Sequence, residues 1–92
     1  MPLLTDAQIA EGLEGREWRR EGEALVRDRR FPDFAAAIAF VERVAEVAEA
    51  SNHHPDILVH GWNKVQLTLS THSEGGITAA DVALAQRLDA LS

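Results

Sequence analysis

Residues Glu49 to Asp81 read EASNHHPDILVHGWNKVQLTLSTHSEGGITAAD and contain all 4 histidines of the 92-residue chain. Two of these, His53 and His54, are adjacent and are followed by Pro55. Because proline cannot continue a helix and biases the preceding residue toward extended backbone, both imidazoles should lie where a helix gives way to a strand. Histidine can give and take protons near neutral pH, so this segment raises a question about catalysis as well as about fold.

Two strands are expected after this junction. Residues 57–62 read as a first strand, and a two-residue turn is predicted at positions 63–64. From Val65 onward, apolar and polar residues alternate, which predicts a half-buried strand that carries His72 at its end, on the polar face or its rim. The glycine pair at 75–76 then breaks the strand.

Helices are predicted on both sides of this strand pair. Before it, Asp33 is a suitable N-cap for a long helix whose apolar residues recur at spacings of three and four: Phe34, Ala37, Ile38, Val41, Val44, Ala45 and Ala48. After it, Thr78 and Asp81 have the spacing of a capping box with a shorter acid. The last amphipathic helix is expected to carry Val82, Leu84, Ala85, Leu88 and Leu91.

The first third of the chain predicts a short helix and another strand pair. Thr5 and Gln8 form a second capping box, so a helix is expected over residues 6–14. Residues 17–31 mix apolar and charged side chains around a turn signal at 21–22, which suits two antiparallel strands. The order α-β-β-α-β-β-α indicates an α+β domain with a four-stranded antiparallel sheet and three helices packed on one face.

Length and composition narrow the class of protein. At 92 residues, positions 1–92 should form a single domain, and so small a domain often associates into an oligomer. The formal charge of −6 argues against nucleic acid or an anionic membrane as the main partner. There is no cysteine, no signal-peptide pattern and no apolar run of membrane-spanning length. We therefore expect a soluble, cytoplasmic protein.

Several kinds of site could account for the histidines. A structural zinc site usually takes four ligands, mostly cysteine and histidine in spaced pairs, and the chain has no cysteine. A serine nucleophile is weaker still, because no Gly-x-Ser-x-Gly elbow is present. Phosphate binding by the 75–76 glycine pair is a generic alternative to a simple turn. A purely structural role suits His60 alone, but it is a poor account of His53, His54 and His72 together.

Short motifs along nearly the whole chain resemble one family, that of the pterin-4a-carbinolamine dehydratases. The Glu-x-x-x-His-His-Pro plus Thr-His combination is the specific part of this resemblance. The matching residues in the second half are Asn52-His53-His54-Pro55, Trp62-Asn63-Lys64-Val65, Thr71-His72, Gly75-Gly76, Thr78 and Asp81. Those upstream are Trp18, Arg30-Phe31-Pro32-Asp33-Phe34 and Glu49.

The resemblance implies dehydration of a 4a-hydroxytetrahydropterin to the quinonoid dihydropterin, with neither a metal nor an organic cofactor. It also implies a homodimer or homotetramer with a functional link to an aromatic amino acid hydroxylase. The residue types suit this reaction. Loss of the C4a hydroxyl as water needs a proton on that oxygen while a proton leaves N5, and imidazoles can serve both transfers near neutral pH.

The resemblance also implies a role for each imidazole. His53 and His72 would be the proton-transfer pair. His54 would mainly bind substrate and share the acid role. Glu49 would orient one histidine or raise its basicity by holding its other N–H.

Three further residues enter the predicted site only by resemblance. Trp18 would stack on or flank the pterin, although a large aromatic side chain taken alone favours a place in the core. Pro55 and Asp81 would shape the site.

Two departures from the family pattern bear on these expectations. Asn52 stands where some members have an acid, so a role of that acid in tuning His53 is in doubt. The segment between Pro55 and Trp62 is one residue longer than in animal-type members and contains Gly61, which predicts a bulge in the strand. A different class of function also stays open: an interaction module that serves as a dimerisation cofactor or an assembly helper for another protein.

Overall fold

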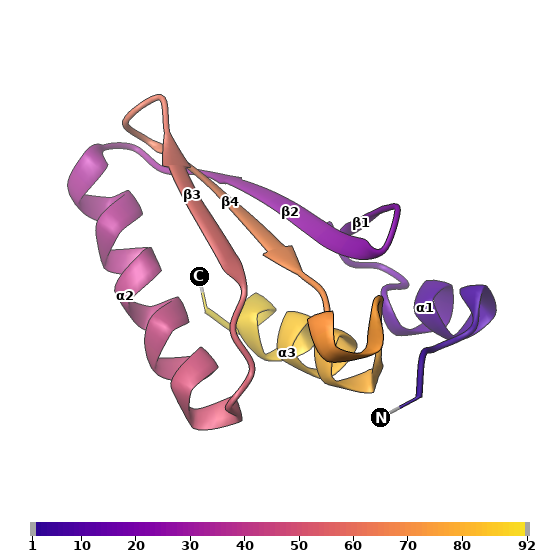
Figure 1. Cartoon of the computed structure of the whole chain (residues 1–92). Helices are drawn as coiled ribbons and strands as arrows, with labels where there is room; N and C mark the ends of the chain where they lie inside the picture. The colour runs from indigo at the N-terminus through magenta and orange to yellow at the C-terminus, as the bar shows by residue number, and fades with distance from the viewer. Residues whose placement is uncertain (1, 92) are drawn as a thin grey trace.

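The computed structural model describes residues 2–91 and has the predicted α+β order. Figure 1 shows a twisted sheet with the helices on one side of it. The elements are α1 (Asp6–Gly12), β1 (Arg19–Glu21), β2 (Ala24–Arg30), α2 (Phe34–Ser51), β3 (Asp56–His60), β4 (Lys64–Leu69), the 3₁₀ turn η1 (His72–Glu74) and α3 (Ala79–Asp89).

Helix starts follow the capping signals in the sequence. The Thr5 and Gln8 capping box begins α1, Asp33 caps α2 through the backbone N–H of Ala36, and the Thr78–Asp81 box begins α3. In each case a side-chain oxygen accepts from a backbone N–H that has no partner within the helix. None of the helices within residues 2–91 combines the length and apolar character that crossing a bilayer requires.

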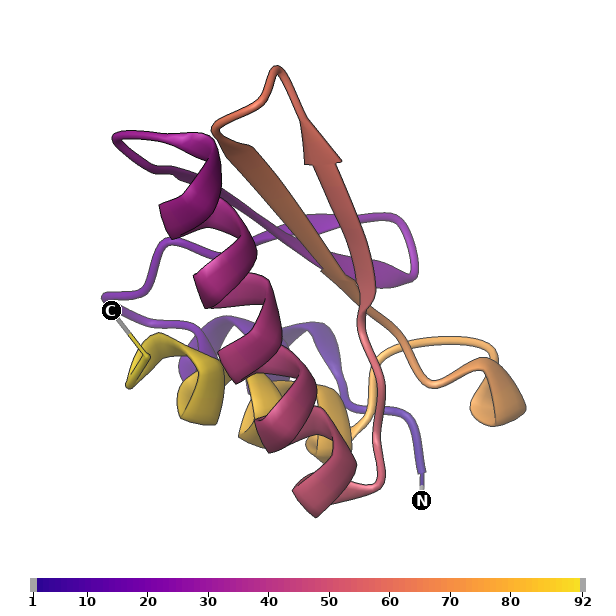
Figure 2. The ribbon, with the colours of Figure 1, turned by 90° about the vertical axis from the view of Figure 1, so that its left-hand side faces the viewer.

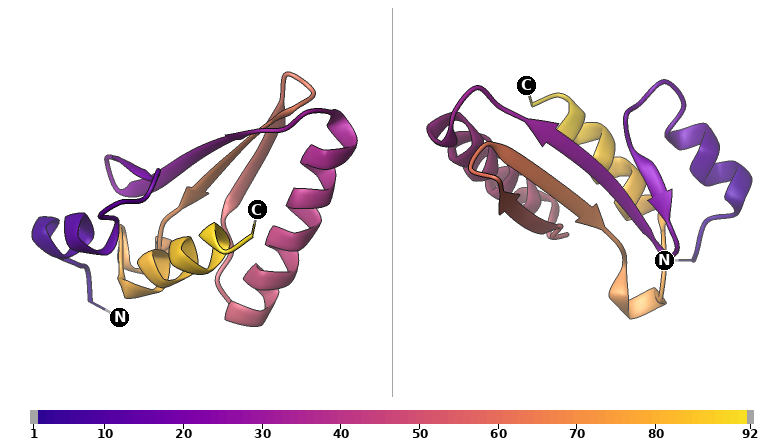
Figure 3. Two further views of the ribbon diagram at one scale, coloured as in Figure 1. Left: turned by 180° about the vertical axis from the view of Figure 1, so that it is seen from behind. Right: turned by 90° about the horizontal axis from the view of Figure 1, so that it is seen from above.

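The sheet is antiparallel throughout, with strand order β1-β2-β4-β3. One face carries apolar side chains from β2 and β4, including Leu25, Leu67 and Leu69, which are buried against α2 and α3. The view from above in Figure 3 shows α2 and α3 under the sheet and α1 beyond β1. The core therefore lies between the sheet and these helices, and the opposite sheet face is left open.

Both strand-pair turns differ in detail from the prediction. The β1–β2 turn is formed by Gly22 and Glu23, one residue further than expected. The β3–β4 connection occupies residues 61–63 instead of 63–64, because Gly61 and Trp62 both adopt positive φ, at 54° and 57°. Positive φ at a hairpin tip matches the right-handed strand twist, which Gly61 allows without strain.

The bulge predicted at Gly61 is wrong. The β3–β4 register runs without a break from Asp56↔Thr68 to His60↔Lys64, so the additional residue lies in the turn and not in the strand. As a result Trp62 stands at the hairpin tip, outside β3, and is 60% exposed. Figure 2 shows this tip projecting at the end of the molecule opposite η1 and the end of α2.

Candidate active site

The junction between α2 and β3 presents His53 to the start of α3. Helix α2 ends at Ser51, and Asn52 takes the left-handed conformation (φ 51°) that turns the chain out of the helix. Asparagine tolerates this conformation better than most residues. The backbone therefore explains why an asparagine suits position 52. The turn brings Nε2 of His53 within 2.6 Å of Oδ1 of Asp81, and the His53 side chain keeps 19% of its exposure.

Asp81 is the buried centre of this site. The residue has no exposed surface, and its carboxylate is surrounded by donors. Oδ2 accepts from the hydroxyl of Thr71 at 2.7 Å and from the backbone N–H of Thr78 at 2.9 Å. The two threonine hydroxyls also bond each other at 2.8 Å. A buried carboxylate is tolerated only with such partners, so the network holds Asp81 in one orientation.

This arrangement fixes which nitrogen of His53 is free. A carboxylate has no proton to donate, so Nε2 of His53 must be the donor to Oδ1 of Asp81. In a neutral imidazole the lone pair then lies on Nδ1, which can accept a proton. If Nδ1 takes up that proton, the adjacent carboxylate stabilises the resulting cation. The Asp81–His53 pair therefore has the chemistry of a general base that can return its proton as an acid.

His54 makes a second, more exposed contact. Its Nε2 lies 3.2 Å from Oε2 of Glu49, and the two side chains are 57% and 78% exposed. Glu49 thus approaches His54 and not His53. The contact with Glu49 orients the His54 ring. Because solvent screens so exposed a pair, the contact contributes little to the stability of the fold. Pro55 comes directly after the two histidines in the chain. It is half-buried and leads into β3.

His72 lies after the strand on which it was predicted. Strand β4 ends at Leu69, and His72 begins η1 with an exposed side chain. The preceding residue, Thr71, is the one that donates to Asp81. His72 therefore directly follows a member of the Asp81 network, but among residues 2–91 its side chain makes no hydrogen bond to Asp81 or His53.

Trp18 is not brought to the histidines. It is buried in the core with 6% exposure, and its indole N–H donates to Oδ1 of Asp89 at 2.8 Å, at the opposite end of α3 from Asp81. Its predicted role beside the pterin stays a prediction. Within residues 2–91, no group of three or more His, Cys, Asp or Glu side chains is placed to hold a metal ion.

We predict that Trp18→Phe lowers the free energy of unfolding by about 1–2 kcal/mol, because a part-buried carboxylate loses a hydrogen bond. Urea unfolding would measure this change, with the exposed Trp62→Phe as the matched control. If Trp18 also contacts substrate, the Michaelis constant of the variant should rise as well. Unchanged stability would contradict the structural role of the Trp18–Asp89 bond.

The hydroxyl partners of Asp81 were not predicted from the sequence. In the sequence, Thr71 stands out only as part of the Thr-His motif, and Thr78 only as a helix cap and a residue that matches the family. The signal was partly present, since the capping box uses Oδ2 of Asp81 and leaves Oδ1 for another donor. Which donor takes that oxygen depends on how α2 and α3 pack, and the sequence does not show this.

The chain is similar to known proteins along nearly its whole length. Residues 2–91 match the sequence profile of the family described as "Pterin 4 alpha carbinolamine dehydratase". A protein of Thermomicrobium roseum named "Putative pterin-4-alpha-carbinolamine dehydratase" is 52% identical, over 100% of this chain and 99% of its own length. A protein of Nocardia farcinica with the same name is 48% identical, over 98% of this chain and 95% of its own.

Two solved structures are also similar. The crystal structure of a transcriptional coactivator/pterin dehydratase from Brucella melitensis has a TM-score of 0.89 and 35% identity, covering 97% of both chains. A pterin dehydratase-like protein described as a RuBisCO assembly factor in the alpha-carboxysome has a TM-score of 0.69 and 31% identity. That match covers 84% of this chain and 90% of the other.

Proposed function

Because this chain belongs to the pterin 4 alpha carbinolamine dehydratase family, we propose that it converts a 4a-hydroxytetrahydropterin to the quinonoid dihydropterin and water. The observation that carries this proposal is the 2.6 Å contact between Nε2 of His53 and the buried carboxylate of Asp81. Such a pair supplies a half-buried imidazole with a defined tautomer at the surface of the domain.

The reaction is a pair of proton transfers around one bond cleavage. The C4a–O bond breaks as the hydroxyl oxygen gains a proton and leaves as water. The proton on N5 departs, and its electron pair forms the N5=C4a double bond. General acid–base catalysis of this kind is typically worth about 10²–10⁴-fold.

In the proposed mechanism, His53 and His72 carry the two protons. Nδ1 of His53 is the free nitrogen of the imidazole that Asp81 holds. His72 is exposed at the rim and can exchange protons with substrate and solvent. His54, oriented by Glu49, would bind the pterin and share the acid role. Asp81 acts through His53, so it is a positioning residue, and Pro55 sets the chain direction between the histidines and β3.

The experiment that tests this proposal generates the substrate in situ. An aromatic amino acid hydroxylase reaction produces the 4a-hydroxypterin, and the absorbance decay of this intermediate is followed with and without the protein. Faster decay in its presence supports the dehydratase. No acceleration by a folded protein would overturn the proposal, with circular dichroism as the check on folding.

For His72→Ala we predict a decrease in turnover of about 10²-fold or more at unchanged thermal stability. The side chain is exposed and makes no hydrogen bond with any other residue in 2–91, so its loss should not disturb the fold. The same decay assay measures the rate, and His60→Ala is the matched control at another exposed histidine. A wild-type rate in His72→Ala would remove His72 from the proton-transfer pair.

A non-catalytic binding role is the second candidate function. The similarity to a RuBisCO assembly factor favours it, since that relative shares the fold at 31% identity. Large apolar side chains are also exposed here, including Phe34 at 54%, Leu58 at 52% and Trp62 at 60%. Exposed apolar groups of this kind serve either a protein partner or self-association into the proposed homodimer or homotetramer. Absence of dehydratase activity in the decay assay would favour the binding role.

A further inference from the structure

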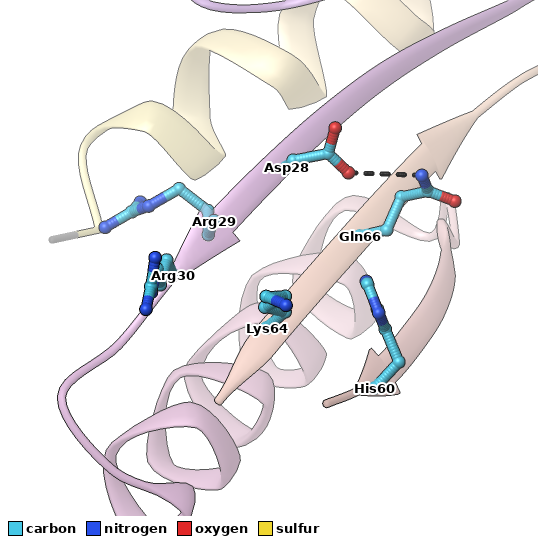
Figure 4. Close-up of a pocket in the computed structure, with 6 residues that line it drawn as sticks. All are labelled: Asp28, Arg29, Arg30, His60, Lys64 and Gln66. Carbon is cyan, nitrogen blue, oxygen red and sulfur yellow. Dashed lines mark hydrogen bonds between the residues drawn. The ribbon is translucent and has the colours of Figure 1, made fainter. Parts of the chain in front are cut away.

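Three side chains that can carry positive charge form one row across the open face of the sheet. The register pairs Arg30 of β2 with Lys64 of β4, and Lys64 with His60 of β3. Residues paired in this way point to the same side of a sheet and stand as close neighbours. Figure 4 shows Lys64 between Arg30 and His60 on three adjacent strands.

This row borders a pocket of about 370 Å³ on the open face. The pocket is lined by the row itself, by Asp28 and Gln66 from the next cross-strand pair, and by Arg29. Arg29 does not add its charge to the open face, because its guanidinium lies 4.8 Å from the ring centre of Phe40. A volume of this size is in the range that binds small organic molecules.

The acidic residue in the pocket is already neutralised. Asp28 accepts from Arg19 at 2.7 Å and from Gln66 at 3.1 Å. The hydrogen bond from Arg19 is the larger cause, and that from Gln66 the smaller, of a pKa of Asp28 below its ordinary value. The carboxylate is therefore charged and hydrogen-bonded at neutral pH. Asp28 also attracts His60 electrostatically, so it offsets part of the charge at that end of the row, while the other two members of the row keep no ion-pair partner among residues 2–91.

Two of the three members of the row, Arg30 and Lys64, have no counter-ion within the described part of the chain. Arg30, Lys64 and His60 make no ion pair or hydrogen bond through their side chains with any residue in 2–91. Like charges directly opposite one another on a sheet are destabilising, and an anion bound between them would offset that repulsion. The chain as a whole carries −6, so an anion would be attracted here by this local row and not by the net charge of the protein.

We propose that the pocket binds a small organic anion that carries a phosphate group, with the phosphate seated on the Arg30–Lys64–His60 row. Arginine presents a planar fork that suits two phosphate oxygens, and lysine adds a compact charge beside it. The methylene stems of both side chains, with the remaining volume, accommodate the organic part. The pocket lies at the opposite end of β3 from His53, so the inference does not depend on the proposed dehydratase activity.

The test is a titration of the ¹⁵N-labelled full chain with phenyl phosphate at constant ionic strength, followed by amide chemical shifts. We expect saturable shifts centred on Arg30, Lys64 and His60. Arg30→Gln and Lys64→Gln should each weaken binding about tenfold, the usual effect of losing one charge-assisted hydrogen bond. The matched control is Arg20→Gln, because Arg20 pairs with Asp6 and lies outside the pocket.

Three outcomes would overturn the inference. These are an absence of saturable shifts in the wild-type chain, saturable shifts centred elsewhere, and equal binding by the pocket variants and Arg20→Gln. Inorganic phosphate is titrated in parallel to distinguish the contribution of the phosphate group to binding from that of the organic part. Tighter binding of phenyl phosphate supports the proposal, and tighter binding of inorganic phosphate contradicts the organic component. Thermal unfolding of each variant confirms that the compared proteins are folded.

Discussion

Replacing His53 by alanine is expected to slow the catalysed dehydration by about 10²–10⁴-fold, the range associated with loss of one general acid–base group. The substitution removes the imidazole that Asp81 holds at 2.6 Å, and with it the free Nδ1 that would accept the N5 proton. The measurement is the decay of the hydroxylase-generated 4a-hydroxypterin at saturating substrate. The decrease should be in turnover more than in the Michaelis constant, because proton transfer is a transition-state interaction.

A matched control separates this effect from a general disturbance of the fold. His60→Ala also removes an imidazole associated with β3, but at the far end of the strand from His53. We expect a wild-type decay rate for His60→Ala. Unfolding curves for both variants are needed, since His53→Ala also deprives the buried Asp81 of one donor. A folded His53→Ala protein that retains the full rate would contradict the assignment of His53 as an acid–base catalyst.

The largest expected effect on stability is that of Asp81→Ala, at about 2–4 kcal/mol of unfolding free energy. The substitution leaves three donors without their shared acceptor: Nε2 of His53, the hydroxyl of Thr71 and the backbone N–H of Thr78. Each buried donor left unsatisfied costs about 1–3 kcal/mol, although the two threonine hydroxyls can partly satisfy each other. Loss of the N-terminal capping box of α3 adds to this cost.

Urea unfolding monitored by circular dichroism measures the Asp81→Ala effect. Glu46→Ala on α2 is the control. It also replaces an acidic residue of a helix by alanine, but at an exposed position. We expect the midpoint of Glu46→Ala to stay close to wild type. If both variants unfold at the same urea concentration, the Asp81 network does not contribute to stability in the way that its burial indicates.

Asp81 also connects the stability of the fold to the site. The same carboxylate starts α3 through Thr78 and holds His53 through its other oxygen. Asp81→Asn keeps the shape of the side chain but places an amide where donors converge. This variant should therefore lose activity through His53, and the loss should appear as a changed pH dependence of turnover. A purely structural role of Asp81 would leave that pH dependence unchanged.

Local pattern was sufficient to predict the element order of this protein. Capping boxes at Thr5 and Thr78, the N-cap at Asp33 and the apolar spacing in residues 34–48 act over a few neighbouring positions. The capping bonds are satisfied within the segment that carries them, so they can be read without knowing the rest of the chain. The histidine motif likewise indicated the family.

The apolar spacing predicts a helix, but its buried face depends on packing against the sheet. The predicted stripe is therefore wrong in part, because Phe34 and Ala45 are exposed and Phe40 is buried.

Predictions that depended on exact backbone angles were less accurate. The β3–β4 turn fell at 61–63 because both Gly61 and Trp62 take positive φ. Glycine made this conformation available, but the sequence did not show that the tryptophan beside it would adopt the same region. The unbroken register of β3 against β4 then selected the turn, because one shifted residue would send every strand side chain to the opposite face.

The fold class, the order of the helices and strands, and the histidine motif of the candidate site can all be read from the residues alone. Three contacts become visible only in the folded chain: Asp81 holds His53, Glu49 approaches His54, and Trp18 bonds Asp89 in the core. These partners are far apart along the chain: His53 and Asp81 are separated by 28 positions, and Trp18 and Asp89 by 71. No local pattern specifies such partners, because they meet only when the helices pack against the sheet and bury them together.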